Sequence, residues 1–454
     1  MTRGNVSTVI LAAGRGTRMK SRLPKVLHAI AGRPLLGHVL AAVEKADVAH
    51  PVLVLAPDMD SVASFARSVL PGIATVVQPS PRGTGDAVRA AETAVGQGAG
   101  VVLVVFGDTP LVRSETLSQM IECCTEEMPV VVLGFEAVDP APYGRLVLDE
   151  KDMLVRIVEA KDASPAEREI RLCNGGAMAV RREHMFRLLA LVGNDNASGE
   201  YYLPDVVGLA RTEGLPCTVV RATEEEIQGV NSRADLAAAE AAMQRRLRKS
   251  ALDDGVTMLD PDTVYLSFDT KIGSDVTIGQ NVVFGPGVRI AEGATIKAFS
   301  HIEGASIAEG AEIGPFARIR PGTEVGRKAK IGNFVETKKA KIEEGAKVSH
   351  LSYIGDARVG AYANIGAGTI TCNYDGYDKF FTDIGSGAFV GSNTSLVAPV
   401  TIGDGAYIGS GSVITKDVAS DALAVARGKQ FEKGGWATKF RAAHESVKKI
   451  SSGE

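Results

Sequence analysis

The stretch from Lys271 to Ile302 decides the fold of the C-terminal half, and it reads KIGSDVTIGQNVVFGPGVRIAEGATIKAFSHI. An aliphatic or aromatic residue stands at every sixth position, and the same rhythm continues with interruptions to Ile414. Neither an α-helix nor a simple strand repeats every six residues. Hexapeptide repeats predict a parallel β-helix, with three short strands per triangular coil and the apolar residues pointing inward. A single coil cannot bury its apolar face, so the coils must stack.

The composition is that of a globular protein with more than one domain. At 454 residues the chain exceeds what one hydrophobic core usually organises, and its 45% apolar and 23% charged residues are ordinary values. The net charge of −4 argues against nucleic-acid binding. The apolar run at 6–13 is too short to span a bilayer, and no signal peptide precedes it. Five cysteines without metal-ligand spacing favour free thiols in a cytoplasmic protein.

The first 230 residues alternate short apolar runs with amphipathic stretches of helical length. Strands are predicted at 8–12, 52–56, 101–106 and 129–135, and helices at 35–44, 86–95 and 114–122. This alternation predicts a Rossmann-like α/β sheet with helices on both faces. A helix predicted at 233–249 would connect the halves. The expected domains are therefore 1–232, a connecting helix and linker at 233–254, the β-helix at 255–426, and a tail at 427–454.

The strongest chemical signal of the N-terminal half is LAAGRGTRM at 11–19, followed by Pro24-Lys25. A strand that runs into a glycine-rich turn leaves backbone N–H groups free, and these groups with nearby cations form a cradle for anions. Met19 stands where a dinucleotide fingerprint has its third glycine, and no Gly-Lys-Ser/Thr of a Walker A loop follows. The loop is therefore predicted to bind phosphates in another way.

In the C-terminal half, polar residues that interrupt the hexads indicate chemistry. The insertion TCNYDGYD at 371–378 lies between two coils, and a polar loop that projects from a regular prism is a common place for a site. The preceding coils carry polar residues outside the apolar column: Arg320, Lys338, His350, Tyr353 and Asn364.

With these motifs the N-terminal half resembles the sugar-nucleotide pyrophosphorylases. Together with its hexapeptide half, the chain is similar over essentially its whole length to the bifunctional N-acetylglucosamine-1-phosphate uridyltransferases and glucosamine-1-phosphate acetyltransferases. The resemblance implies left-handed coils, a homotrimer, Mg²⁺ as cofactor, and no nucleic-acid or membrane partner. The implied substrates are UTP, N-acetylglucosamine-1-phosphate, glucosamine-1-phosphate and acetyl-CoA.

In the N-terminal domain the resemblance implies a uridyltransferase site. Arg18 and Lys25 would stabilise the triphosphate and the sugar phosphate, and Asp108 and Asn231 would supply the hard oxygen ligands that Mg²⁺ prefers. The implied nucleotide-binding residues are Leu11, Ala12, Gly14, Lys25, Gln78, Gly83 and Thr84. Those implied for N-acetylglucosamine-1-phosphate are Gly144, Glu159, Asn174 and Asn231.

In the β-helix the resemblance implies an acetyltransferase site. His350 would be the general base that takes a proton from the sugar amine as it attacks the thioester. The residues implied for glucosamine-1-phosphate are Arg320, Lys338, Tyr353 and Asn364. Those implied for acetyl-CoA are Ala367, Asn373, Tyr374, Ser392, Ser410 and Arg427. The tail after residue 427 would either cover the acetyl site of a neighbouring subunit or be disordered.

Two alternatives to a bifunctional enzyme remain open. A pyrophosphorylase with one activity would use its β-helix as a regulatory module, as in glucose-1-phosphate adenylyltransferases, but His350 and the 373–374 loop argue against this. A scaffold or exchange-factor subunit would have lost its activity, but Arg18, Lys25 and Asp108 argue against that. Three positions depart from the family pattern, at contacts often made by backbone, and predict altered affinity with unchanged chemistry: Phe106, Gly175 and Ser410.

Overall fold

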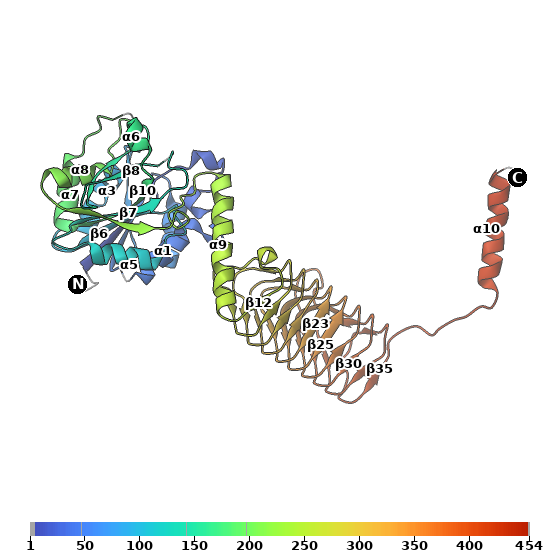
Figure 1. Ribbon diagram of the computed structural model, residues 1–454. Helices are drawn as coiled ribbons and strands as arrows, with labels where there is room; N and C mark the ends of the chain where they lie inside the picture. The colour runs from blue at the N-terminus through green and yellow to red at the C-terminus, as the bar shows by residue number, and fades with distance from the viewer. Residues whose placement is uncertain (1–4, 47, 142, 197, 453–454) are drawn as a thin grey trace. The chain divides into compact units, whose positions relative to one another are not determined.

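The chain forms two compact units. The computed structural model describes residues 5–46, 48–141, 143–196 and 198–452 (Figure 1). The first unit comprises Met1–Ala251 with Tyr265–Phe268, and the second comprises Leu252–Val264 with Asp269–Glu454. Within the described ranges, no helix has both the length and the apolar character that crossing a membrane requires.

A mixed sheet forms the centre of the first unit, with strand order β11-β7-β10-β6-β1-β4-β5. Its strands are β1 (Val6–Leu11), β4 (His50–Leu55), β5 (Ala74–Val77), β6 (Val101–Phe106), β7 (Val130–Glu136), β10 (Leu172–Arg181) and β11 (Cys217–Ala222). Strand β10 runs antiparallel to β6 and β7, and the other neighbours are parallel. Two short hairpins are also present, β2 (Ala29–Ile30) with β3 (Arg33–Pro34), and β8 (Arg145–Leu148) with β9 (Leu154–Val158). The four predicted strands are confirmed, with ends that differ by up to two residues.

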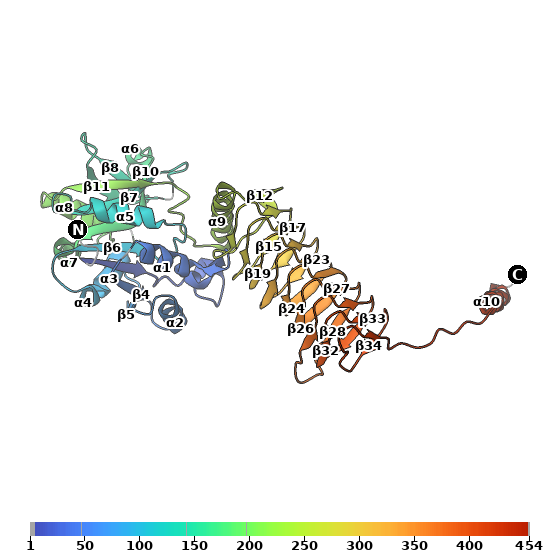
Figure 2. The same cartoon turned by 90° about the horizontal axis from the view of Figure 1, so that it is seen from below.

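Helices cover both faces of this sheet (Figures 1 and 2). One face carries α1 (Leu35–Lys45), α2 (Asp60–Val69) and α5 (Ser114–Cys123), whereas the other carries α3 (Thr84–Ala90), α4 (Glu92–Val95), α7 (Arg182–Leu191) and α8 (Asp205–Thr212). The side chains of β1 alternate between the two cores, Ile10 facing the first set and Val9 the second, because successive strand residues point to opposite faces. The helix predicted at 86–95 is instead two helices, α3 and α4, which meet at Ala91.

Parallel strands bring distant loops to one edge of the sheet. Leu11, the last residue of β1, is paired with Phe106 at the end of β6 and with Val54 in β4. The segments that follow β1 and β6 therefore leave the sheet side by side, and the Gly107 N–H donates to the Leu11 carbonyl at 2.9 Å. In open α/β sheets ligands bind outside such carboxyl ends.

Helix α9 (Arg233–Asp253) confirms the helix predicted at 233–249 and extends four residues beyond it, and its residues up to Ala251 belong to the first unit. Its Ala239 and Met243 belong to a small apolar cluster with Met19, which is 1% exposed, and Leu35. Met19 thus replaces the third glycine of a dinucleotide loop because its side chain anchors the turn on α1 and α9.

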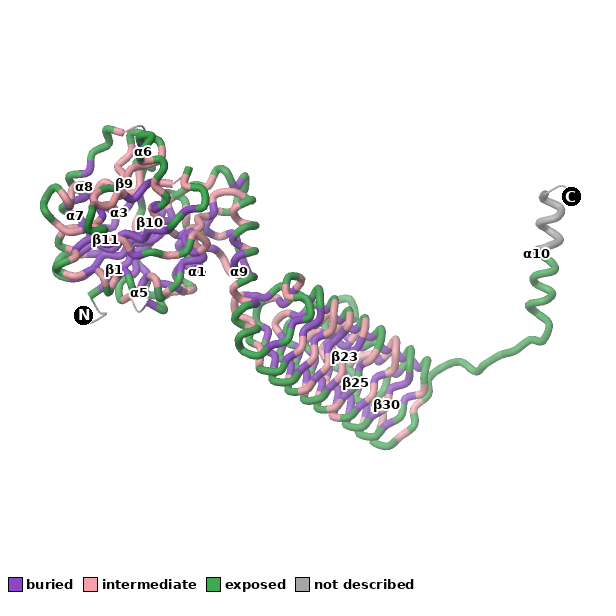
Figure 3. The backbone as a smooth tube through the Cα atoms, viewed as in Figure 1, coloured by how far each residue is buried: buried purple, intermediate pink, exposed green. Residues whose placement is uncertain are grey.

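The second unit is the parallel β-helix that the six-residue rhythm predicts. Its apolar residues pair with their counterparts one coil away, as in the series Ile278, Ile296, Ile313, Ile331. These residues are buried, and Figure 3 shows buried positions alternating with more exposed ones along the coils. One face of the prism is a continuous parallel sheet: β12 (Thr257–Met258), β14 (Thr277–Ile278), β17 (Thr295–Ile296), β20 (Glu312–Ile313), β23 (Lys330–Asn333), β25 (Lys347–His350), β27 (Asn364–Ile365), β30 (Phe389–Val390), β33 (Tyr407–Ile408) and β35 (Leu423–Ala424).

The other two faces are joined by long strands that turn a corner. They comprise β13 (Lys271–Ile272), β15 (Val283–Phe284), β16 (Arg289–Ile290), β18 (His301–Ile302), β19 (Ala305–Ile307), β21 (Arg318–Ile319), β22 (Thr323–Val325), β24 (Glu336–Ile342), β26 (Tyr353–Val359), β28 (Ile370–Cys372), β29 (Thr382–Ile384), β31 (Ser395–Val397), β32 (Val400–Ile402) and β34 (Val413–Ile414). In the tail, residues Trp436–Ser452 form helix α10, which the sequence analysis did not predict.

One corner of the β-helix exposes apolar side chains on successive coils. Phe299, Phe316, Phe334 and Leu351 each have a positive φ of 50–60° and are 45–62% exposed. The first three rings stack, with centroids 4.8 and 5.1 Å apart. We call these four residues the apolar ladder. Bulky residues seldom adopt a left-handed backbone conformation, so this exposed corner is unusual.

Candidate active sites

The glycine-rich turn after β1 is held against the segment that carries Lys25. Gly16 has φ of 60°, and a Cβ atom there would lie 2.6 Å from the Lys25 Cβ atom. Only glycine therefore permits this packing. The turn continues into two short 3₁₀ helices, η2 (Thr17–Met19) and η3 (Lys25–Leu27). Arg18 lies exposed on η2, whereas Lys25 is buried at the start of η3.

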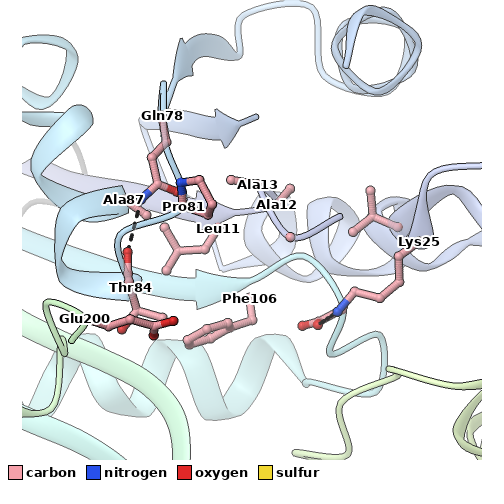
Figure 4. Close-up of a pocket in the computed structure, with 14 residues that line it drawn as sticks. Leu11, Ala12, Ala13, Lys25, Gln78, Pro81, Thr84, Ala87, Phe106 and Glu200 are labelled. Atoms are coloured by element: carbon pink, nitrogen blue, oxygen red, sulfur yellow. Dashed lines mark hydrogen bonds and ion pairs between the residues drawn. The ribbon is translucent and has the colours of Figure 1, made fainter. Parts of the chain in front are cut away.

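A pocket opens at the carboxyl edge of the sheet between this turn and the start of α3 (Figure 4). The structure brings all seven residues expected to bind nucleotide into its lining: Leu11, Ala12, Gly14, Lys25, Gln78, Gly83 and Thr84. Asp108 lines the same pocket. Sequence reasoning gave no role to five further lining residues: Ala13, Val26, Pro81, Ala87 and Glu200.

The Lys25 ammonium bridges the two residues expected to bind Mg²⁺. Its Nζ donates to the Asp108 carboxylate and, at 3.0 Å, to Asn231 Oδ1. The side chains of Lys25 and Asp108 are only 9% and 19% exposed, so each charge needs the other. Two hard oxygens therefore converge on one cation. This donor set fits Mg²⁺, which takes its remaining ligands from phosphates and water.

The start of α9 positions Asn231. The Asp235 carboxylate accepts hydrogen bonds from the backbone N–H groups of Asn231 (3.0 Å) and Ser232 (2.9 Å), and Ser232 Oγ accepts one from the Asp235 N–H. This reciprocal pairing is that of an N-terminal helix cap. The Val230 N–H donates to the Asp108 carbonyl at 2.9 Å, which holds the two oxygen-bearing residues together.

A second pocket adjoins the first and shares Thr84, Phe106 and Glu200 with it. Of the residues expected to bind the N-acetylated sugar, Glu159 and Asn174 line it. Sequence reasoning gave no role to Tyr202, which lines it as well. Asn231 does not line this pocket and lies instead beside Lys25.

Gly144 borders the sugar pocket without a side chain of its own. The Asn174 N–H donates to the Gly144 carbonyl at 2.8 Å, and a Cβ atom on Gly144 would lie 3.4 Å from Glu159 Oε1. Burial raises the pKa of the Glu159 carboxyl, and the charges of Asp162 and Asp205 raise it further. The walls of this pocket therefore favour a neutral, hydrogen-bonding partner.

In the β-helix, four of the six residues expected to bind acetyl-CoA follow His350 along one corner, whereas Asn373 and Tyr374 lie in the inserted loop. Backbone hydrogen bonds connect one coil to the next: Gly368 N–H to the His350 carbonyl (3.2 Å), Asn393 N–H to Ala367 (2.7 Å), and Gly411 N–H to Ser392 (2.8 Å). The Arg427 side chain donates to the Ser410 carbonyl at 2.6 Å. The five residues thus stack in one column, which continues the corner of the apolar ladder: His350, Ala367, Ser392, Ser410 and Arg427.

His350 and the inserted loop have fixed partners beside this column. His350 Nδ1 lies 2.5 Å from Asn333 Oδ1, so an N–H on Nδ1 leaves Nε2 as the basic nitrogen. Asn373 donates to Asp356 at 2.5 Å, and the Tyr374 hydroxyl donates to the Gly376 carbonyl at 2.6 Å.

Cations gather on a neighbouring face of the prism. The pKa of the Lys338 ammonium is lowered, first by the charge of Lys379 and then by that of Arg320. Arg320 is paired with Glu336 at 2.7 Å, and Tyr353 lies close enough to influence its pKa. Asn364 is on β27, within the continuous face. Sequence reasoning missed Lys379, which the fold of the inserted loop returns toward Lys338.

Comparison with known proteins identifies the two halves. Residues 8–198 match the MobA-like NTP transferase domain, and 269–304 and 381–416 match the bacterial transferase hexapeptide repeat. The chain is 67% identical over 99% of its length to the whole bifunctional protein GlmU of Parvibaculum lavamentivorans. It is 54% identical over 99% of both chains to that of Paramagnetospirillum magneticum.

This chain belongs to the GlmU family. Its match to GlmU of Azorhizobium caulinodans, 53% identical, again covers 99% of this chain and all of the other. Membership covers both units, and the hexapeptide match agrees with left-handed coiling of the β-helix. The family resemblance expected from the motifs and the fold class is confirmed.

Proposed function

We propose that the chain makes UDP-N-acetylglucosamine in two steps, one in each unit. The β-helix N-acetylates glucosamine-1-phosphate with acetyl-CoA, and the α/β unit couples the product to UTP with release of pyrophosphate. The observation that carries this proposal is that one chain, related over its whole length to bifunctional proteins, holds two separate clusters of reactive groups.

In uridyl transfer, a phosphate oxygen of the sugar phosphate attacks the α-phosphorus of UTP, and pyrophosphate leaves. Such a reaction depends on positioning and on neutralising charge. Lys25 lies at the wall of the nucleotide pocket, and Arg18 on η2 would neutralise further phosphate charge. The adjoining pocket with Glu159 and Asn174 would hold the sugar.

Asp108 and Asn231 would hold a magnesium ion in this site. Their oxygens already share one cationic partner, Lys25 Nζ, so they are spaced for a cation. When bound, Mg²⁺ neutralises phosphate charge. Asp108 and Asn231 are kept in place by the backbone contact from Val230 and by the α9 cap.

In acetyl transfer, the sugar amine attacks the thioester carbonyl, and coenzyme A leaves as its thiolate. The Nε2 atom of His350 accepts the amine proton, since Asn333 holds Nδ1. Arg320, Lys338 and Lys379 would bind the sugar phosphate, and the column from Ala367 to Arg427 would line coenzyme A.

We further propose that the protein is a cytoplasmic homotrimer. Its five cysteines are free thiols, as a reducing compartment favours. The apolar ladder is an exposed strip of three aromatic rings and a leucine. It lies on the same corner as the column that begins at His350. Contact with a second chain along this corner would cover the strip and enclose the acetyl site.

One experiment tests both activities. Purified full-length protein is given glucosamine-1-phosphate, acetyl-CoA, UTP and Mg²⁺, and free thiol and pyrophosphate are assayed separately. Both should appear, and omission of acetyl-CoA should remove both. Pyrophosphate formed from N-acetylglucosamine-1-phosphate without any thiol release from glucosamine-1-phosphate would leave a pyrophosphorylase with one activity.

A further inference from the structure

Gln78 lies at the wall of the nucleotide pocket with both of its N–H groups engaged by the protein. Its Nε2 atom donates to the Gly83 carbonyl at 3.1 Å and to Asp86 Oδ2 at 2.9 Å. Figure 4 shows the side chain beside Pro81 and Ala87. Gln78 is 5% exposed and Asp86 is 7% exposed, so these bonds are shielded from water.

These two acceptors fix which end of the Gln78 amide faces the pocket. If the amide were flipped, its oxygen would face a carbonyl oxygen and a carboxylate, which offer no hydrogen to share. The shielded oxygens therefore allow one orientation, with nitrogen toward the protein. Oε1 has no donor among the residues that the structure describes, which leaves it as an acceptor for a ligand.

Arg82 fixes Asp86 in turn. Its guanidinium donates to Asp86 Oδ1 at 3.0 Å, while Oδ2 receives the Gln78 amide. The two carboxylate oxygens thus have different partners, and neither is free to rotate away. The side chain of Arg82 itself is 64% exposed and does not line the pocket.

We propose that Asp86 is a positioning residue that makes the site prefer UTP to CTP. The inference rests on the proposed uridyl transfer. Uracil carries an N–H at its N3 position, whereas cytosine carries a bare lone pair there. A Gln78 oxygen locked toward the pocket accepts a hydrogen bond from uracil and repels cytosine. A site built around one such hydrogen bond discriminates strongly, because the wrong base leaves it unpaired.

Asp86→Asn is the decisive variant. With Arg82 still donating, the new amide turns its oxygen toward Arg82 and its N–H₂ toward Gln78, which favours the flipped Gln78. The full-length protein is titrated with UTP and with CTP by calorimetry, in Mg²⁺ and without a sugar phosphate. The preference for UTP over CTP should fall about ten-fold, the usual effect of one misdirected hydrogen bond.

A double variant separates orientation from general damage. In Arg82→Met/Asp86→Asn the amide of residue 86 is free to turn its oxygen back toward Gln78, so part of the preference should return. Glu92→Gln, an exposed acid-to-amide change on α4, is the matched control and should leave the preference unchanged. If Asp86 had a merely structural role, the single variant would bind UTP and CTP equally weakly relative to the native protein. The second change would then restore none of the preference for UTP.

The outcomes are distinct. An unchanged UTP-to-CTP ratio in Asp86→Asn, or an equal loss of both affinities, overturns the proposal. If that variant does not fold, Gln78→Met tests the amide directly: UTP should bind about ten-fold more weakly while CTP binds no more weakly than before, and an unchanged ratio again overturns the proposal. A native protein without preference for UTP would end the proposed function also, whereas a selective native protein with insensitive variants ends this inference alone.

Discussion

The two units assemble their sites by opposite means. The α/β unit gathers Lys25, Gln78, Asp108 and Asn231 from distant parts of the chain to the edge of a sheet and the start of a helix. The β-helix repeats one corner, so that the residues of one column recur about once per coil: His350, Ala367, Ser392, Ser410 and Arg427. A periodic fold thus makes a site whose geometry follows from spacing, whereas a layered fold requires the tertiary structure.

This contrast also separates the ways in which each site can fail. In the α/β unit, Lys25 contacts both Asp108 and Asn231 directly, so the loss of Lys25 or of either partner disturbs the cluster. In the β-helix, neighbouring coils contact mainly each other, and substitutions should act locally.

Asp108→Asn should abolish the activity of the α/β unit and leave that of the β-helix intact. Its carboxylate balances Lys25 and would bind the metal, so uridyl transfer should fall about 10²–10³-fold or more, while acetylation is unchanged. Pyrophosphate release and free thiol are measured on the same preparation. Parallel loss of both activities would contradict two independent sites.

His350→Ala should impair only the activity of the β-helix. Loss of the general base should slow acetylation about 10²–10⁴-fold and leave uridyl transfer intact. His301→Ala, which removes another exposed histidine of the β-helix, is the control and should change neither activity. Normal thiol release in the His350 variant would exclude this residue as the base.

Lys379→Met should weaken substrate binding more than chemistry. Removing one of three clustered cations should raise the KM for glucosamine-1-phosphate about ten-fold, with a smaller change in kcat, because a charge-assisted hydrogen bond is lost. Lys347→Met, which removes an exposed lysine of β25, is the control and should leave this KM unchanged. A KM that does not move would place the phosphate elsewhere.

Asp235→Ala should have the smallest effect. Removal of the cap should cost about 1 kcal/mol in the free energy of unfolding of the first unit, and displacement of Asn231 should raise the Mg²⁺ concentration needed for uridyl transfer. Thermal unfolding and Mg²⁺ titrations measure the two effects. Asp235→Asn keeps a hydrogen-bond acceptor, so its stability and its Mg²⁺ requirement should lie between those of the native protein and of Asp235→Ala. Equal Mg²⁺ requirements in all three proteins would show that the cap does not position the metal site.

Much of the fold was predictable because its signals are local. The six-residue repeat predicted the β-helix, and alternating apolar runs predicted β1, β4, β6 and β7. The break between α3 and α4 was missed, since the apolar pattern runs through Ala91 without a glycine or proline. Lys379 was missed because it follows the inserted loop, and only the folding of that loop returns it to Lys338.

By itself the sequence determined the architecture and the family, and it predicted candidate residues for both sites, because periodicity and short motifs are properties of neighbouring residues. The tertiary structure alone decided that Met19 anchors the glycine-rich turn, that Lys25 bridges Asp108 and Asn231, and that Asp86 contacts Gln78. These contacts depend on the directions and partners of side chains brought together by the fold. No spacing along the chain specifies which of several acceptors an amide or an ammonium group will meet.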